Sequence, residues 1–456
     1  MRNVERNAKH GHEEVVELTT SSQHHQELLN IEGELDVNSS DTYTVQQAVN
    51  LLGFGWFHVK LSLIVGLCWM ADSMEMTILS IIGPTMQCDW NISTYQKALM
   101  TTVVFLGMMI SPLFWSQLSH RYGRKSALTF CGVLLVLYSL LSSVAPNFIW
   151  LLILRGLVGF AIGCTPQSVT LYAEFLPSKY KGKCVVLMDC FWALGACFEI
   201  TLALAVYPNF GWRWLLGLSA APLLLFTALT PIAKDNNRQM LIGRLIVDYE
   251  TNSPVQMRTL LKPELRKITL LLWFLWMSCA FCYYGLVLIT VELFLKDKVN
   301  SVNQGCSTFN TQDFMDLLWI TFSEFPGIFV TIAIIKRCGK KKTMAMQFLI
   351  FSGCVSILSL IKSRIYTTTV LFIARGVISG LFQAAYIYTP EIYPKNLRAV
   401  GVGGCSTIAR IGAMATPFVS QVLLHNSSSS ALNIYSLVGL LSAVACIILP
   451  DSKILG

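Results

Sequence analysis

Charged residues are scarce in this sequence. Asp, Glu, Lys and Arg make up 13% of its 456 residues, whereas hydrophobic residues make up 54% and the mean hydropathy is +0.56. Soluble globular domains carry about 25% charged residues, so the composition excludes that class. Long apolar runs stand where charge is missing. They predict an all-α polytopic membrane protein embedded in the lipid bilayer.

Several sequence motifs that are typical of ATP-binding, catalytic or metal sites are also absent. The sequence has no G-x-x-x-x-G-K-[ST] loop, which argues against ATP-driven pumping, and no H-E-x-x-H or G-x-S-x-G motif of hydrolytic enzymes. Cys279-x-x-Cys282 lacks a second ligand pair and lies in an apolar run, which favours packing over zinc binding. We therefore expect no enzyme activity, no cofactor and no metal site.

The apolar runs are long enough to cross a bilayer, which takes about 20 residues per helix. They predict twelve transmembrane helices near residues 59–83, 95–118, 126–145, 149–171, 183–206, 212–232, 268–293, 314–335, 343–361, 367–388, 399–422 and 431–449. Six precede and six follow one hydrophilic stretch, so two bundles are expected.

These runs divide the chain into five parts. Residues 1–58 are polar and predict a disordered cytosolic tail, because such a composition cannot bury enough apolar surface. The N-terminal six-helix bundle is expected at 59–232, a cytosolic connector at 233–267, and the C-terminal six-helix bundle at 268–449. Residues 450–456 form a second short cytosolic tail.

Basic residues in the connectors give the orientation. Most of them fall on one side of the expected membrane, and positive residues stay in the cytosol. Both termini are therefore expected in the cytosol, and the net charge of +8 requires no nucleic-acid partner. Cys88 and Cys306 fall on the outer side, where a disulfide can form. The sequons at Asn91 and Asn426 fall there too, in connectors that are short for glycosylation.

Three short motifs occur twice. The pairs are Arg121-x-Gly123-Arg124-Lys125 with Arg337-x-Gly339-Lys340-Lys341, Arg155-Gly156 with Arg375-Gly376, and Glu174-x-x-Pro177-x-x-x-Lys181 with Glu391-x-x-Pro394-x-x-x-Arg398. The nearly constant spacing between copies predicts two homologous halves, as in many carriers. We interpret these motifs as a cytosolic gate in which basic turns pair with carboxylates. The alternative is that the basic turns only set topology.

These motifs resemble those of the major facilitator superfamily, and the resemblance covers residues 45–450. The strings 69–76, 166–177 and 211–216 are similar to the synaptic-vesicle-2-related branch, especially its SVOP-like member. The resemblance implies a twelve-helix major facilitator fold with a central site open alternately to each side, and a monomeric transport unit. It also implies a vesicle membrane, although the topology equally allows the plasma membrane. It implies little about the cargo.

The sequence departs from the superfamily pattern in its gate. Ser116 and His120 stand where the family turn has glycine and aspartate, and Lys336 stands where the second half would have an acid. The family's Pro-Glu-Ser-x-Arg signature after span six is also absent. These departures predict a weaker gate and keep a second interpretation open, a transport-inactive, transporter-like binding or scaffold protein.

Ionisable residues near span centres are the main functional candidates, because a charge there is costly unless it is paired, hydrated or used. Asp72 and Glu75 lie three residues apart on one face of span one. Two adjacent carboxylates repel each other, which favours a proton or cation site. The alternative is structural pairing with a basic residue. Glu324 and Arg410 lie at similar depth, and we expect them to form an ion pair.

Aromatic and polar side chains are expected around the same site. Tyr283 and Tyr284 in span seven could hold an organic cation by cation–π attraction, and Gln383 and Tyr386 in span ten could add hydrogen bonds. Core packing is an equally good explanation of these aromatic residues. The sequence favours a secondary transporter of a small organic solute, which this interpretation expects to be cationic. Transport would be driven by the gradient of the solute or coupled to protons through Asp72 or Glu75.

Overall fold

The computed structural model describes residues 42–43, 49–50, 53–177, 179–180, 184, 187–232, 244–245, 257–302, 309–361, 363–394 and 397–450. The first half contains α3 (Trp56–Trp90), α4 (Thr94–Tyr122), α5 (Arg124–Ser143), α6 (Phe148–Ile162), α7 (Thr165–Phe175), α9 (Asp189–Leu218) and α10 (Ala221–Ile232). The second half contains α11 (Pro263–Val302), α12 (Thr311–Phe322), α13 (Glu324–Cys338), α14 (Lys340–Leu358), α15 (Arg364–Ile392), α16 (Arg398–Pro417), the π-helix η3 (Phe418–Leu423), α17 (Leu424–Asn426) and α18 (Ser428–Ile448).

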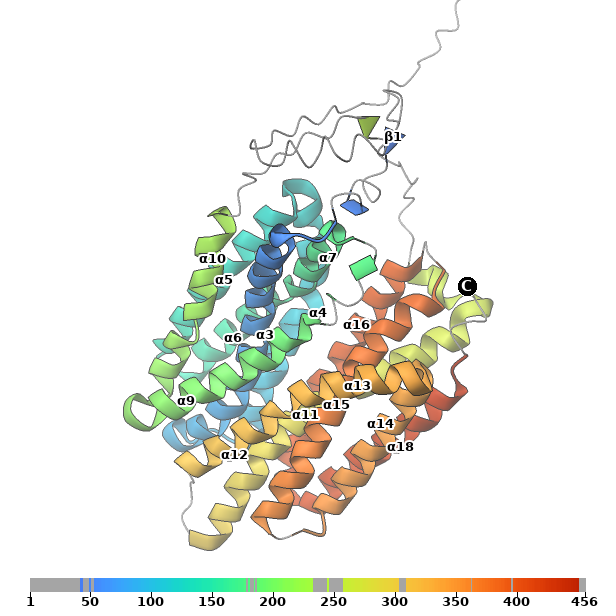
Figure 1. Ribbon diagram of the computed structural model, residues 1–456. Coiled ribbons are helices and arrows are strands. Elements are labelled where there is room, and N and C mark those ends of the chain that lie inside the picture. The colour runs from blue at the N-terminus through green and yellow to red at the C-terminus, as the bar shows by residue number, and fades with distance from the viewer. Residues whose placement is uncertain are drawn as a thin grey trace, which may run out of the picture.

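The helices form two bundles that lie side by side (Figure 1). In the first half α3 packs on α9 and α4 packs on α6, and in the second half α11 packs on α16 and α14 packs on α15 and α18. The halves meet where α16 contacts α4 and where α12 contacts α9. The all-helical fold expected from the apolar runs is therefore confirmed.

Each expected span coincides with a helix or with two successive helical segments. Eight segments of the described chain are long and apolar enough to cross a membrane. Two of them are not straight helices: Thr311–Cys338 joins α12 to α13 at Ser323, and Asp189–Ala228 contains Gly211, which kinks α9 with a φ of 77°. The expected span 149–171 is also built from two helices, since α6 gives way to α7 at Gly163. Because Asp189–Ala228 covers residues of two expected spans, the number of such segments does not equal the number of crossings.

The repeated basic turns have the same backbone in both halves. Gly123 joins α4 to α5 with a φ of 84°, and Gly339 joins α13 to α14 with a φ of 81°. Only glycine adopts this left-handed region without strain, which explains the glycine in both copies of the motif. We call the end of the molecule that carries these turns the basic end, and the opposite end the far end.

The Arg-Gly repeat also has a packing reason. A Cβ atom added to Gly107 of α4 would lie 2.4 Å from the carbonyl oxygen of Gly156, and one added to Gly327 of α13 would lie 2.2 Å from that of Gly376. In each half, two helices therefore approach through a pair of glycines. Such small residues are typical of close contacts between membrane helices.

Parts of the tail and connector are described. Strand β1 (Thr42–Tyr43) pairs in parallel with β2 (Arg244–Leu245), and the 3₁₀ helix η1 (Met257–Leu261) precedes α11. The rest of 1–58 and of the connector, apart from residues next to the helices, lies outside the described residues. Cys88 at the far end of α3 is disulfide-bonded, whereas Cys306 lies outside the described residues.

Candidate functional site

Two buried ion pairs lie at mid-depth, one in each half. Arg155 of α6 pairs with Glu75 of α3, and Arg375 of α15 pairs with Glu324 at 2.6 Å between Nε and Oε1. The expected ion pair between Glu324 and Arg410 is wrong. Depth along the membrane normal does not decide which helices are neighbours: α13 packs against α15, while the helix of Arg410 packs against α11 and α4.

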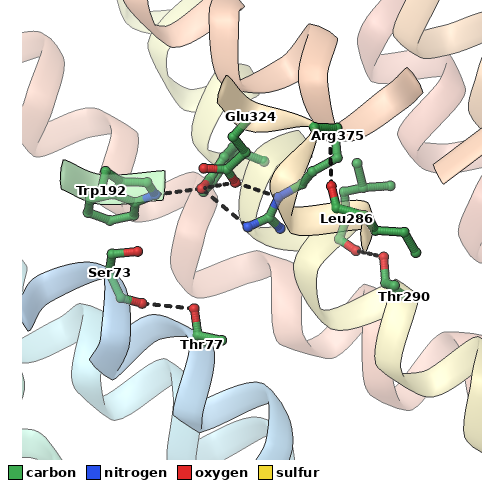
Figure 2. Close-up of polar contacts among 10 residues, drawn as sticks. Ser73, Thr77, Trp192, Leu286, Thr290, Glu324 and Arg375 are labelled. Atoms are coloured by element: carbon green, nitrogen blue, oxygen red, sulfur yellow. Dashed lines mark hydrogen bonds and ion pairs between the residues drawn. The ribbon is translucent and has the colours of Figure 1, made fainter. Parts of the chain in front are cut away.

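The second pair belongs to a hydrogen-bond chain that reaches the other half. The Tyr283 hydroxyl of α11 donates to Glu324 at 2.8 Å and accepts a hydrogen bond from Trp192 Nε1 of α9 at 2.6 Å. The Arg375 guanidinium also lies over the Tyr283 ring, 4.8 Å from its centroid. Figure 2 shows Trp192, Glu324 and Arg375 converging from three helices. This chain of contacts joins the two bundles at mid-depth.

A central cavity with a volume of about 70 Å³ lies between the bundles. Six of the eight side chains expected at a solute or coupling site line it together, namely Asp72, Tyr283, Tyr284, Gln383, Tyr386 and Arg410. Glu75 and Glu324 do not line this cavity, since each is the partner of a buried arginine. The wall is built by α3 and α9 of the first half and by α11, α15 and α16 of the second.

Sequence reasoning missed several lining residues. Asp189, Trp69, Trp192, Trp276 and Phe382 also face the cavity. Asp189 carried a usable signal, because it lies within a span that was expected to begin at residue 183. The tryptophans carried none, because aromatic side chains occur throughout these apolar helices and only packing shows which of them face inward.

Two polar groups of this cavity, on Asp72 and Trp69, lack a hydrogen-bond partner that buried groups usually have. Asp72 is 6% exposed, yet its Oδ1 has no hydrogen-bond partner, and the same holds for Nε1 of Trp69. Within the described part of the chain, Arg410 makes no ion pair. Its side chain does form a hydrogen bond with Tyr284, and it interacts electrostatically with Asp72. Buried polar groups are normally satisfied, so these are candidates for contact with a ligand.

Contacts between the halves join the two bundles at the far end of the molecule. Lys97 of α4 pairs with Glu292 of α11 at 2.6 Å, and the lysine is only 2% exposed. Tyr207 of α9 packs edge-on against Phe314 of α12, with ring centroids 5.8 Å apart. Neither side chain of the ion pair was expected to join the halves, because the partners are distant in sequence and each lies in a different bundle.

The gate residues are found in several places. Lys340 pairs with Glu391 at the basic end, and Arg398 Nε donates to the carbonyl oxygen of Tyr393 at 3.2 Å. The guanidinium of Arg121 lies over the Tyr122 ring, 5.4 Å from its centroid. Arg337 lies in the last turn of α13. The side chains of Arg124, Lys125 and Glu174 and the whole of Lys181 lie outside the described residues.

Arg155 and Arg375 do not take part in this arrangement at the basic end. Both are held at mid-depth by the buried ion pairs described above. Asn91 and Asn426 of the two sequons are exposed at the far end. In the described residues, no group of three or more His, Cys, Asp or Glu side chains is placed to hold a metal ion.

Comparisons with known proteins were made for both the sequence and the fold. Residues 62–302 match the model of the Major Facilitator Superfamily. The chain is 48% identical over 447 residues to the synaptic vesicle 2-related protein of Bos taurus, covering 90% of this chain and 81% of that protein. It is 31% identical over 466 residues to SVOPL of Homo sapiens, covering 91% and 93%. The expected preference for the SVOP-like member is therefore wrong, since the likeness to the synaptic vesicle 2-related protein is higher.

One solved structure shows the same architecture. A D-xylose-proton symporter superposes with a TM-score of 0.68 at 14% identity, covering 86% of this chain and 98% of that chain. At this identity the likeness concerns the fold alone. It agrees with the arrangement of the helices in two bundles.

Proposed function

Because the chain belongs to the Major Facilitator Superfamily, a family of membrane transporters and not of enzymes, we propose that it carries a small organic solute by alternating access. In this mechanism two similar bundles rock about a shared site between them. The observation that carries the proposal is the central cavity, which both bundles line and in which Asp72 keeps an oxygen without a protein partner.

The walls of the cavity favour a solute with a positive charge. Two carboxylates, Asp72 and Asp189, lie among the rings of Trp69, Trp192 and Trp276. Aromatic faces attract cations by about 0.5–2 kcal/mol each, and more when the site is dry. An organic ammonium group would therefore be held by both the acids and the rings.

Asp72 is also our candidate for proton coupling. It lies in the cavity beside a second acid, whereas Glu75 is the partner of Arg155 and has a structural reason to be charged. A carboxylate without a partner at mid-depth can bind a proton or a cation in exchange. We therefore assign coupling, if the solute gradient alone does not drive transport, to Asp72 and not to Glu75.

The ends of the cavity fit such a cycle. The ion pair of Lys97 and Glu292 closes the far end and must break when the bundles rock the other way. We propose that the basic end faces the cytosol, with both termini, because it carries the repeated Arg/Lys turns. A vesicle membrane is supported by the name of the synaptic vesicle 2-related protein, which this chain resembles over 90% of its length.

Uptake by the full chain in proteoliposomes tests the proposal, with radiolabelled choline as the first probe and with and without an imposed pH gradient. We expect saturable uptake that Asp72→Asn lowers by about tenfold or more, since a charge-assisted contact in a buried site is worth more than about 1.4 kcal/mol. Asp316→Asn, at the far end and outside the cavity, is the matched control. Unchanged uptake in Asp72→Asn removes this residue from the mechanism. Binding without flux in the unsubstituted protein would favour the scaffold interpretation.

A further inference from the structure

The cavity differs from the rest of the protein interior in how it treats charge. Three buried basic residues outside it are each paired: Arg155 with Glu75, Arg375 with Glu324, and Lys97 with Glu292. Inside the cavity, within the described part of the chain, neither Arg410 nor Asp72 makes an ion pair. These buried bases outside the cavity are therefore neutralised by a partner, whereas one base, Arg410, and two acids, Asp72 and Asp189, face the cavity without an ion pair among the described residues.

Leaving Arg410 and Asp72 unpaired is costly. A charge within the hydrocarbon layer costs several kcal/mol unless a partner or water compensates for it. Arg410 and Asp72 are close enough to interact electrostatically, yet they do not join in an ion pair. The space between them is the cavity itself, which α3 lines from the first bundle and α16 from the second. Groups of opposite charge on one ligand would satisfy both side chains at once.

We propose that the solute is a zwitterion, whose ammonium group lies between Asp72 and the tryptophans and whose carboxylate is bound by Arg410. The planar guanidinium offers two parallel N–H donors, which match the two oxygens of a carboxylate. This inference rests on the proposed function, since it assigns the chemical class of the solute carried in the same cavity.

A solute with two charged ends also explains how binding acts on the bundles. Its cationic end contacts the first bundle through Asp72, and its anionic end contacts the second through Arg410. A ligand shifts a conformational equilibrium only by its differential affinity for the two states. A molecule that must bridge both bundles binds best when they are close together, so it favours the occluded state. The second acid, Asp189, leaves the cavity with one more acid than base, and a co-transported proton would balance it.

Four probes of nearly the same shape separate the contributions of the two charges. Glycine betaine carries both charges, choline carries only the positive one, 3,3-dimethylbutanoate only the negative one, and 3,3-dimethylbutan-1-ol neither. Their binding is measured by quenching of tryptophan fluorescence in the full chain in detergent, and their uptake is measured in proteoliposomes. We expect glycine betaine to bind about tenfold or more tightly than each singly charged probe.

Variants of Arg410 test the assignment of the anionic end. Arg410→Gln should abolish the preference for glycine betaine over choline. Arg410→Lys should keep part of that preference, because a lysine keeps the positive charge but not the paired N–H donors of the guanidinium. A thermal melt of each variant, beside Asp316→Asn, checks that the fold is kept.

Two results would overturn the inference. One is equal binding of glycine betaine and choline by the unsubstituted protein, and the other is a preference for glycine betaine that survives in Arg410→Gln. Either result leaves the carrier function intact, because choline uptake measures that function separately. Failure of all four probes to bind or to be taken up would overturn both proposals together.

Discussion

The two halves of this protein solve the same packing problem with different partners. Each buries an arginine of an Arg-Gly motif at mid-depth and pairs it with a glutamate. In the first half Glu75 comes from α3, whereas in the second half Glu324 comes from the start of α13. Arg375 additionally contacts Tyr283 of α11. The repeated motif therefore places an arginine at the same position in both halves, whereas the helix that supplies its glutamate partner differs.

This difference matters for the cavity. Because Glu75 is engaged in the ion pair with Arg155, the neighbouring Asp72 is the acid of α3 that remains available to a ligand. Because Arg375 is engaged in the ion pair with Glu324, the base that remains available to a ligand is Arg410 of α16. Structural pairing in each half thus helps to select which charges face the cavity: Asp72, together with Asp189 of α9, from the first half and Arg410 from the second.

The largest expected effect comes from breaking the buried pair of the second half. Glu324 is 0% exposed and also accepts a hydrogen bond from Tyr283, whereas Glu75 is 11% exposed. Glu324→Gln should lower the free energy of unfolding by about 3–5 kcal/mol, and Glu75→Gln by less. Chemical unfolding in mixed micelles measures both. Equal losses of stability would show that the two halves hold their arginines equally tightly. The double variant Glu324→Gln with Arg375→Met should recover part of the stability lost in Glu324→Gln, because it removes the unpaired buried arginine.

The ion pair between the halves should have the next largest effect. Lys97→Met or Glu292→Gln alone leaves a buried charge without its partner, at a cost of about 2–5 kcal/mol. The double variant should be more stable than the sum of the two losses, by about 1–3 kcal/mol of coupling. The matched cycle uses Arg364 and Asp316, which pair within the second half and are more exposed. Coupling no greater for Lys97 than for that pair would argue against a closed far end.

Substitution at the closely packed glycine pairs should cause a smaller loss of stability, similar in size in both halves. Gly107→Ala and Gly327→Ala would each place a methyl group against a backbone carbonyl oxygen, so the two helices must move apart to make room for it. We expect each to cost about 1–3 kcal/mol of unfolding free energy. Gly353→Ala in α14 serves as the control, because a Cβ atom there meets nothing within 4 Å. A neutral result at only one of the two glycine pairs would mean that the packing repeat is not shared.

The smallest effect should come from the two basic turns. Gly123→Ala and Gly339→Ala meet no steric obstacle, so only the positive φ is strained, at about 1–2 kcal/mol. Thermal melts should show the same decrease for both variants. Gly55→Ala, where φ is −131° and no atom lies within 4 Å, should leave the melting temperature unchanged. Different decreases at the two turns would show that tertiary contacts outweigh the local backbone there.

Much of the fold and part of the site could be predicted from sequence. Apolar runs are local, so the positions of the crossings were clear without any partner. Asp72, Tyr283 and Arg410 could be named as candidates because a polar residue in an apolar run is conspicuous by itself. Asp189 was missed although it lies near the start of such a run, and Lys97 was not named as a candidate. Neither shows its role until the helix that faces it is known.

The sequence by itself determined the membrane-embedded helices, the duplicated halves and the glycines of the two turns, because hydropathy, repetition and backbone conformation are properties of neighbouring residues. Only the tertiary structure decided that Glu324 pairs with Arg375 and not with Arg410, that Lys97 meets Glu292, and that Asp72 and Arg410 share a cavity. Ion pairs and cavities depend on which helices touch and how each is rotated. Those choices are made by packing across long sequence separations.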